Sequence, residues 1–523
     1  MPMPSVPPVA EATAVAAPRT SGPDFQSLPA LLATVAPLLG SHLRQAEAGE
    51  GPVIRQPPLA TLAATLDADR WIREGGLHGE ALAEFVRAYL AATTRLHHPG
   101  YFAHQVALPH PAGAIGALLD GALNNPMGIY EMGPPAATLE MVTLNWMLEK
   151  VGWNPPPLPP QPPVSDRCRV GGGVLTHGGS LATLTALAAA RSRCAPEAWS
   201  TGTPGDLVVL APAASHYAVA RAVGILGLGQ QALRPAPCDA DGRLDPQALP
   251  QAVAELRAAG KRIMAVVANA CSTASGLYDP LRPVGEFCRA EGLWLHVDGA
   301  HGASALVSPT LRRLLDGVEL ADSLVWDAHK MLQTPTVCAA VLVRDGRTLD
   351  HAFQEEASYL FHDKDQPGID LLHRTVECTK AALGLRLFLV LAAEGEAGIA
   401  RHVEGCYARA GAAARQIAAT PGFRVAASPQ ANIVCFRWER AGGTATDDDA
   451  DLLDLRRTLL AEGDFYLSST LYRGQRWLRL VFMNPAAPTA SLDRLLVRIG
   501  TLAAEMSRKS EIAPGSPVDA LKR

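Results

Sequence analysis

Short apolar segments alternate with amphipathic segments from about residue 167 to about residue 345. Apolar runs of about 4–8 residues without polar interruptions are typical of strands buried on both faces. The runs are DLVVLAP (206–212), RIMAVVAN (262–269), LWLHVD (293–298), DSLVWD (322–327) and CAAVLVRD (338–345). Helical patterns occur at 180–193, 216–229 and 249–260. This alternation predicts an α/β fold with a mainly parallel sheet covered by helices on both faces.

The regions on either side have different patterns. An amphipathic helical pattern is clearest at 78–96, and a long helix is predicted at 375–395. The apolar runs at 432–438 and 476–484, with helices between and after them, predict an α+β C-terminal domain. The predicted organisation is a disordered lead-in at 1–25, an N-terminal helical segment at 26–95, a large domain at 96–385, a small C-terminal domain at 386–505 and a tail at 506–523.

Composition narrows the possible partners and compartment. The chain is 48% hydrophobic and 19% charged with a net charge of −5, so nothing indicates a nucleic acid or a membrane as partner. Nine scattered cysteines without a C-x-x-C pair predict a reduced, cytoplasmic chain. The proline-broken N-terminus lacks the basic start of a signal peptide, and no apolar run reaches membrane-spanning length.

Residues that follow the predicted strands are candidate ligand-binding residues, because open α/β sheets bind ligands beyond the carboxyl ends of their strands. In GGGVLTHGGSLATLTAL, Gly179 and Ser180 lie where a helix starts, and free N–H groups at such a start suit a phosphate. The same residues could form a plain glycine turn with a serine cap. Asp298 follows LWLHV, where it could hold a ring nitrogen protonated or cap the next helix.

Lys330 ends the stretch VWDAHK, directly after a strand. A lone lysine is usually solvated, but a lysine in a cleft can lose its proton and form a Schiff base with a carbonyl. His216 follows another strand and is either a structural hydrogen-bonding residue or a ring-stacking group. A phosphate-binding turn, an acid, a histidine and a lysine at strand ends of one sheet are what pyridoxal 5'-phosphate (PLP) requires. The set therefore predicts a PLP enzyme.

From HHPGYFAHQ (97–105) to RWLRLVFMNPAA (476–487), the sequence resembles the group II PLP-dependent amino-acid decarboxylases. This family includes the glutamate, cysteine-sulfinate, 2,4-diaminobutyrate and aromatic-amino-acid decarboxylases. The resemblance implies the fold-type I, aminotransferase-like architecture and a homodimer with shared active sites. It also implies decarboxylation of an L-amino acid to the amine and CO2.

The resemblance assigns roles to individual residues. It implies cofactor binding by Gly179, Ser180, His216, Thr273, Asp298, Ala300, His329 and Lys330. The family's usual GTT reads Cys271-Ser272-Thr273 here. The implied catalytic residues are Lys330, His216 and Tyr359, the last on a mobile loop where it protonates the substrate carbon after CO2 leaves. No metal is implied.

Two further segments, GYFAHQV and NNPMGIYEMGP, match the substrate side of the family's active site. The resemblance implies substrate contacts by His104, Gln105, Asn124, Tyr130 and Arg479. These polar groups favour a polar substrate resembling 2,4-diaminobutyrate, glutamate or aspartate. Pro126 and Gly128 replace the Asn and Phe of the glutamate decarboxylase pattern, which indicates a pocket of different shape.

Other activities remain open at this point. The same scaffold supports other PLP reactions, such as decarboxylation with oxidative deamination to an aldehyde, or aldolase-type cleavage. Tyr359 argues against the aldehyde product, because loss of that tyrosine is the usual route to it. A PLP-binding regulator without catalysis is disfavoured, because the sequence has no basic helix-turn-helix segment.

Overall fold

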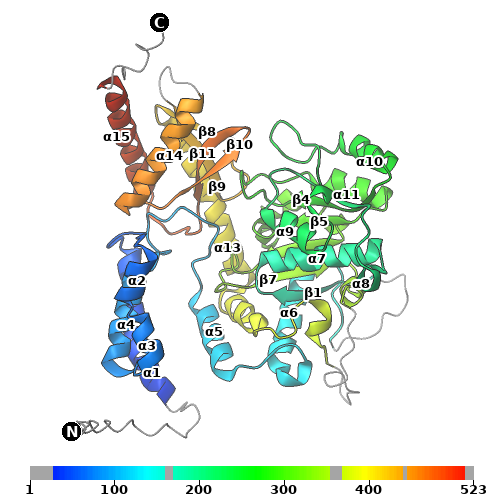
Figure 1. Ribbon diagram of the computed structural model, residues 1–523, viewed down its shortest axis with the longest axis horizontal. Coiled ribbons are helices and arrows are strands. Elements are labelled where there is room, and N and C mark those ends of the chain that lie inside the picture. The colour runs from blue at the N-terminus through cyan, green and yellow to red at the C-terminus, as the bar shows by residue number, and fades with distance from the viewer. Residues whose placement is uncertain (1–26, 159–168, 354–367, 440–444, 513–523) are drawn as a thin grey trace, which may run out of the picture.

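The computed structural model describes residues 27–158, 169–353, 368–439 and 445–512, and its larger sheet has seven strands within them (Figure 1). The strands are β1 (Gly172–Thr176), β2 (Leu207–Ala211), β3 (Leu233–Pro235), β4 (Arg262–Asn269), β5 (Leu295–Asp298), β6 (Ser323–Asp327) and β7 (Ala339–Val343). Their order is β1-β7-β6-β5-β4-β2-β3, and only β7 runs antiparallel to its neighbours. Strand β1 therefore runs in the same direction as β6, and the carboxyl ends of β1, β2, β4, β5 and β6 share one edge.

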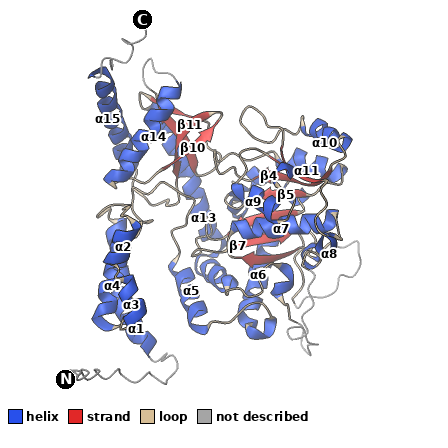
Figure 2. Cartoon of the chain, viewed as in Figure 1, coloured by secondary structure: helices blue, strands red, loops and turns tan. Residues whose placement is uncertain are grey.

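Helices cover both faces of this sheet, as the uniformly apolar strands predict (Figure 2). They are α6 (Pro134–Val151), α7 (Gly179–Cys194), α8 (Ala198–Thr201), α9 (Tyr217–Ile225), α10 (Leu249–Ala258), α11 (Leu281–Ala290), α12 (Arg347–Asp350) and α13 (Leu383–Ala419). In β2, Leu207 and Val209 pack in one core with α7 and α9. Val208 and Leu210 face the opposite core, formed with α6, α10, α11 and α13.

The C-terminal part is an α+β unit around an antiparallel sheet of order β10-β11-β9-β8. Its elements are β8 (Phe423–Val425), β9 (Ile433–Trp438), α14 (Ala445–Glu462), β10 (Ser468–Tyr472), β11 (Gln475–Val481) and α15 (Ala490–Ile512). One face of this sheet packs against α14, α15 and the end of α13, and the other joins the core of the large sheet. The predicted fold class, α/β with an α+β C-terminal domain, is confirmed.

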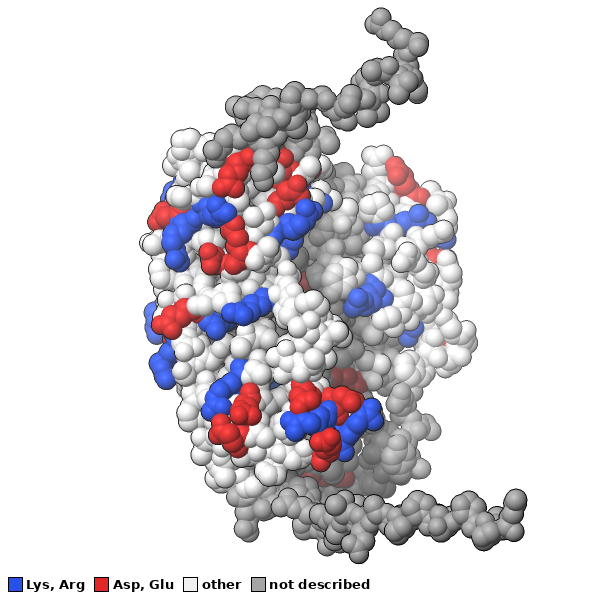
Figure 3. Space-filling view, turned by 60° about the vertical axis from the view of Figure 1, so that its left-hand side comes forward, with Lys and Arg blue, Asp and Glu red and all other residues white. Residues whose placement is uncertain are grey.

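Five helices precede the large sheet and α6 in the described chain. They are α1 (Leu28–Glu47), α2 (Leu59–Thr65), α3 (Ala68–Glu74), α4 (Gly79–Ala92) and α5 (Pro111–Leu123). Helices α1–α4 lie to one side of the large sheet (Figure 1), and the segment after α1 is tied to the C-terminal part by Val53 N–H donating to the Gly463 carbonyl at 2.7 Å. Basic and acidic side chains are interspersed on the face shown in Figure 3. No helix among the described residues is long and apolar enough to cross a bilayer.

The long helix predicted at 375–395 starts later and continues further than its sequence pattern indicates. Helix α13 begins at Leu383, bends at Gly395, where φ is +64°, and ends at Ala419. Lys380 explains the late start, because its fully buried ammonium pairs with Glu140 of α6 while its carbonyl accepts from Met127 N–H. These tertiary contacts hold the preceding residues in a non-helical path.

The C-terminal helix also extends past the predicted start of the tail. Helix α15 continues to Ile512, beyond residue 506 where the tail was predicted to begin. The sequence contains no helix breaker between these residues, and Pro514 follows. The predicted lead-in at 1–25 lies outside the described residues.

Candidate active site

A cavity of about 210 Å³ lies at the edge where the parallel strands end. Its wall is formed by Gly179, Ser180, Thr183, His216, Ala218, Cys271, Thr273, Asp298, Ala300, His301, Asp327, His329 and Lys330. The fold thus brings all eight residues predicted to bind the cofactor into one wall. The turn after β1 lies at the same sheet edge as the other wall residues, because the antiparallel β7 between β1 and β6 leaves those two strands running in the same direction.

The glycine turn between β1 and α7 leaves its backbone open to the cavity. Helix α7 begins at Gly179, and its cap residue is Gly178, so Ser180 is not the helix cap. A Cβ on Gly179 would lie 2.8 Å from both carboxylate oxygens of Asp327, which makes glycine necessary there. Leu181 and Ala182 N–H donate to the Gly178 carbonyl, whereas the N–H groups of Gly179 and Ser180 have no partner among the described residues and, together with the helix dipole, favour an anion.

Asp298 is the last residue of β5, and it is buried, with 9% of its surface exposed. Its Oδ1 accepts a hydrogen bond from Ala300 N–H at 3.2 Å. The next helical turn, Gly302–Val307, has His301 as its cap residue, so Asp298 caps no helix. The carboxylate therefore belongs to the cavity wall.

Lys330 lies opposite a second buried carboxylate. Its Nζ is 3.1 Å from Asp327 Oδ2, and the Asp327 side chain is almost fully buried. His329 Nε2 is 3.6 Å from the same oxygen, and His329 Nδ1 is 2.8 Å from the Cys338 carbonyl oxygen. The strand-end lysine therefore lies in the cavity beside an anionic partner rather than in solvent.

His216 both caps a helix and lines the cavity. Its Nδ1 accepts a hydrogen bond from Ala218 N–H at 3.2 Å, at the start of α9. Burial lowers the pKa of His216, although the charge of Asp298 acts in the opposite direction. A ring that accepts at Nδ1 and is neutral carries its proton on Nε2.

Five residues of the wall were not assigned to the site from the sequence: Thr183, Ala218, Cys271, His301 and Asp327. Helical spacing could have identified Thr183, which lies four residues after Gly179 and donates to the Gly179 carbonyl at 2.8 Å. Asp327 ends a strand and so meets the criterion used for Asp298. His301 is fully buried and its pKa is lowered to about 3, by burial first and then by the charge of Lys330.

Arg479 of β11 comes close to this cavity from the C-terminal sheet. Its side chain is buried, and Nη1 donates to the Ala103 carbonyl and to Ser468 Oγ, both at 3.3 Å. Its Nε and Nη2 are buried without a hydrogen-bond partner in the described structure. Arg479 does not itself line the cavity; it pairs in register with Cys435, whose Sγ donates to the Ala274 carbonyl at 3.1 Å, next to the wall residue Thr273.

The other predicted substrate residues are placed differently. Gln105 is partly buried and its Nε2 has no partner among the described residues, whereas His104 is exposed with Nε2 2.9 Å from Tyr466 Oη. Asn124 is exposed at the end of α5, and Tyr130 N–H donates to Asp370 Oδ1 at 2.9 Å. None of the five predicted substrate residues is among the described residues that line the cavity. Tyr359 lies outside the described residues.

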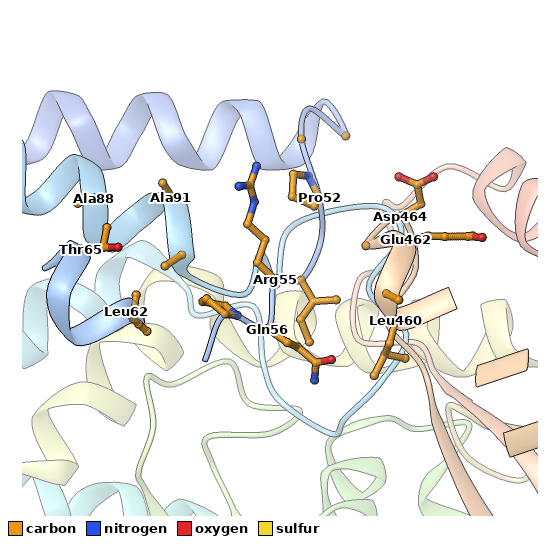
Figure 4. Close-up of a pocket in the computed structure, with 17 residues that line it drawn as sticks. Pro52, Arg55, Gln56, Leu62, Thr65, Ala88, Ala91, Leu460, Glu462 and Asp464 are labelled. Carbon is orange, nitrogen blue, oxygen red and sulfur yellow. The ribbon is translucent and has the colours of Figure 1, made fainter. Parts of the chain in front are cut away.

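A larger cavity, of about 1060 Å³, lies between the N-terminal helices and the C-terminal part (Figure 4). Its polar lining includes Arg55, Gln56, Glu462 and Asp464, but it contains none of the predicted site residues. Among the described residues, no group of three or more His, Cys, Asp or Glu side chains could hold a metal ion. Chemistry, rather than size, therefore identifies the cavity at the strand ends.

The donor set of the smaller cavity fits PLP. The open turn at Gly179 suits the phosphate, the buried Asp298 carboxylate suits the pyridine nitrogen, and the Lys330 amine suits the aldehyde. The cavity has room for one small ring with its phosphate.

Comparison with known proteins agrees with this geometry. The model of the pyridoxal-dependent decarboxylase conserved domain matches residues 76–439. The chain is 28% identical to an acidic amino acid decarboxylase of Mus musculus, over 86% of this chain and 81% of that protein. It is 27% identical to the cysteine sulfinic acid decarboxylase of Homo sapiens, over 84% of this chain and 89% of that protein.

Structural similarity extends over nearly the whole chain. The crystal structure of Oryza sativa TDC with PLP and tryptamine is similar with a TM-score of 0.82 and 25% identity, covering 93% of this chain and 100% of that one. The protein described here therefore belongs to the pyridoxal-dependent decarboxylase family and is a PLP-dependent enzyme that decarboxylates an amino acid.

Proposed function

We propose that this enzyme removes the α-carboxyl group of a short acidic L-amino acid, such as aspartate, cysteine sulfinate or glutamate, and releases the amine. The observation that carries the proposal is Arg479, a buried guanidinium near the wall residue Thr273 with two nitrogens that have no hydrogen-bond partner among the described residues. A buried charge without a counter-charge is costly, and a substrate carboxylate or sulfinate would neutralise it with charge-assisted hydrogen bonds. A cationic side chain such as that of 2,4-diaminobutyrate would be repelled. The names of the two relatives above support an acidic substrate.

In the proposed reaction, most residues of the wall have a defined role. The bound cofactor supplies an electron sink for the bond that breaks at the substrate α-carbon. Lys330 provides the amine for the aldehyde, and Asp327 orients that amine. Asp298 holds the ring nitrogen protonated, and the neutral His216 ring stacks on the ring plane. The remaining contacts to the phosphate and the ring come from Gly179, Ser180, Thr273, Ala300 and His329.

On the substrate side, Arg479 and Gln105 receive a carboxylate of the substrate, with His104 at the entrance. Tyr359 delivers the proton to the α-carbon after CO2 leaves. Asn124 and Tyr130 also belong to the proposed substrate pocket. Asn124 is exposed at the end of α5, and in the proposed homodimer a neighbouring chain completes the pocket there.

The substrate class is tested with Arg479→Gln, which keeps a polar side chain but removes the charge. We expect kcat/KM for the preferred acidic substrate to fall about 10²-fold, the effect of losing a buried charge-assisted contact. The measurement is release of CO2, amine and aldehyde from L-aspartate, L-cysteine sulfinate, L-glutamate, L-2,4-diaminobutyrate and L-tyrosine.

Arg476→Gln is the matched control, because Arg476 lies three residues earlier on the same strand and, unlike Arg479, is only partly buried. It should leave kcat/KM close to that of the wild type. Faster turnover of L-2,4-diaminobutyrate or L-tyrosine than of any acid by the wild type would reject the acidic substrate while leaving the decarboxylase family intact. Aldehyde as the main wild-type product would reject the amine-forming reaction.

We also propose that the enzyme is a cytoplasmic homodimer with shared active sites. All eight cysteines within the described residues are free thiols, as in a reducing compartment. Ile115, Leu119 and Leu123 form an exposed apolar stripe along α5, with 54%, 42% and 65% exposure. Such a stripe beside Asn124 is suited to cover by a second copy of the chain.

The dimer is tested by sedimentation equilibrium of the holoenzyme, which should give twice the chain mass of 55.1 kDa. Leu119→Glu with Leu123→Glu should raise the dimer dissociation constant by at least about tenfold, because two charges would be buried in an apolar contact. Val497→Glu, an equally exposed site on α15, should not change it. A monomeric wild type would exclude shared active sites.

A further inference from the structure

A second cluster of charged side chains lies at the edge of the large sheet opposite the active-site cavity. It surrounds a cavity of about 300 Å³, here termed the arginine cavity, lined by Arg169, Arg193, Trp294, Asp322, Arg344, Asp345, Arg347, Thr348 and His351. Trp294 and Asp322 directly precede β5 and β6, and Arg344 directly follows the antiparallel β7. The arginine cavity is therefore at the far end of the strands whose carboxyl ends carry Asp298 and Lys330.

One carboxylate in this cavity forms ion pairs with two arginines. Asp322 Oδ1 is 2.5 Å from Arg344 Nη2 and 3.3 Å from Arg193 Nη1, and Asp322 Oδ2 accepts from Leu295 N–H at 3.0 Å. The backbone bond and the two guanidinium contacts use most of the acceptor capacity of Asp322. The two cations exceed the single anion, and Arg344 Nε is buried without a hydrogen-bond partner in the described structure.

The remaining charges among the described residues of the lining do not correct this excess. Asp345 is engaged by Arg347, with Nε at 2.9 Å from Oδ1 and Nη2 at 2.7 Å from Oδ2, a bidentate pair that is locally neutral. Arg169, which enters the cavity from the segment before β1, forms no ion pair with a described residue. The lining thus holds four arginines against two aspartates.

We infer that the arginine cavity binds a phosphate dianion, either the free ion or the phosphate of a small phosphomonoester. Arg169, Arg193 and Arg344 come from three separate segments and converge on one partly enclosed volume, with an excess of positive charge that matches a dianion. Planar guanidinium groups match phosphate oxygens better than a point charge does. This site is separate from the phosphate turn at Gly179 and does not depend on the proposed substrate.

The inference is tested by titrating the holoenzyme calorimetrically with sodium phosphate, against sodium chloride at equal ionic strength. The holoenzyme is used so that the turn at Gly179 is already filled. We expect one phosphate site per chain beyond the cofactor, and at least about tenfold weaker binding in Arg169→Gln and in Arg193→Gln, since each removes a charge-assisted contact. Arg415→Gln, which removes an exposed arginine of α13, is the matched control and should bind phosphate like the wild type.

Glycerol phosphate and succinate distinguish the possible ligands. Binding of glycerol phosphate as tight as that of phosphate supports a phosphomonoester, and binding of phosphate alone supports the free ion. Preference for succinate, a heat signal reproduced by chloride, or equal phosphate affinity in the wild type and both arginine variants would overturn the inference. Arg169→Gln removes no hydrogen bond or ion pair with a described residue, so its thermal unfolding midpoint should equal that of the wild type, and a loss of binding with an unchanged midpoint does not reflect unfolding.

Discussion

Lys330→Ala should abolish decarboxylation, with turnover at least about 10³-fold below the wild type, because the variant has no amine in the cavity to bond the cofactor. The purified wild type should be yellow and should retain cofactor covalently after borohydride reduction, and the variant should not. Peptide mapping of the reduced wild type should place the cofactor on Lys330. Visible absorbance and mass spectrometry measure this independently of activity.

Removal of Lys330 also leaves the buried Asp327 carboxylate without its cation, so loss of activity in the alanine variant alone could reflect a weakened fold. Lys330→Arg separates the two effects, because it retains a cation beside Asp327 while its guanidinium cannot act as a nucleophile at neutral pH. It should be folded by circular dichroism and inactive. Lys261→Ala, at the surface before β4, is the control and should remain active. Retention of the reducible link in Lys330→Ala would mean that another lysine carries the cofactor.

Asp298→Asn should lower kcat by at least about 10²-fold while leaving the fold unchanged. The amide is neutral and cannot hold the ring nitrogen of the cofactor protonated, which removes one preorganised electrostatic contact. Its oxygen can still accept from Ala300 N–H, the hydrogen bond that the Asp298 side chain makes in this structure. The measurements are steady-state CO2 release, cofactor content and the thermal unfolding midpoint.

Asp206→Asn serves as a control, because Asp206 lies at the opposite end of the sheet and pairs with Arg262 on the surface. It should leave kcat unchanged. If Asp298→Asn binds the cofactor and turns over at the wild-type rate, the acid has only a structural role and the proposed electron sink lacks its protein partner.

Local sequence was sufficient to predict five strands of the large sheet and the candidate site residues that follow three of them. The apolar runs predicted β2, β4, β5, β6 and β7, because a strand buried on both faces has no alternating polar residues. Since ligands bind beyond the carboxyl ends of such strands, His216, Asp298 and Lys330 were candidate site residues. The lysine in VWDAHK was a candidate because a charged side chain directly after a buried strand is costly unless it has a partner or a function. Family resemblance added Thr273 and Ala300, which no local pattern marks as ligands.

Other features depend on contacts between residues far apart in the chain, which no local pattern records. The antiparallel insertion of β7 brings the turn at Gly179 to the same edge as Lys330, and strand order is a property of non-local pairing. The start of α13 follows from the buried Lys380–Glu140 pair, which overrides local helix propensity.

The sequence alone was thus sufficient for the α/β class, for strands β2, β4, β5, β6 and β7 and for the chemical types at their ends, because these follow from periodicity and local burial. The tertiary structure was needed to establish that Asp327 faces Lys330, that Arg479 is buried in the small sheet with two nitrogens lacking a partner among the described residues, and that Arg193 and Arg344 converge on Asp322 at the far edge. The physical reason is that burial of a charge and the identity of its partner are set by packing between distant segments.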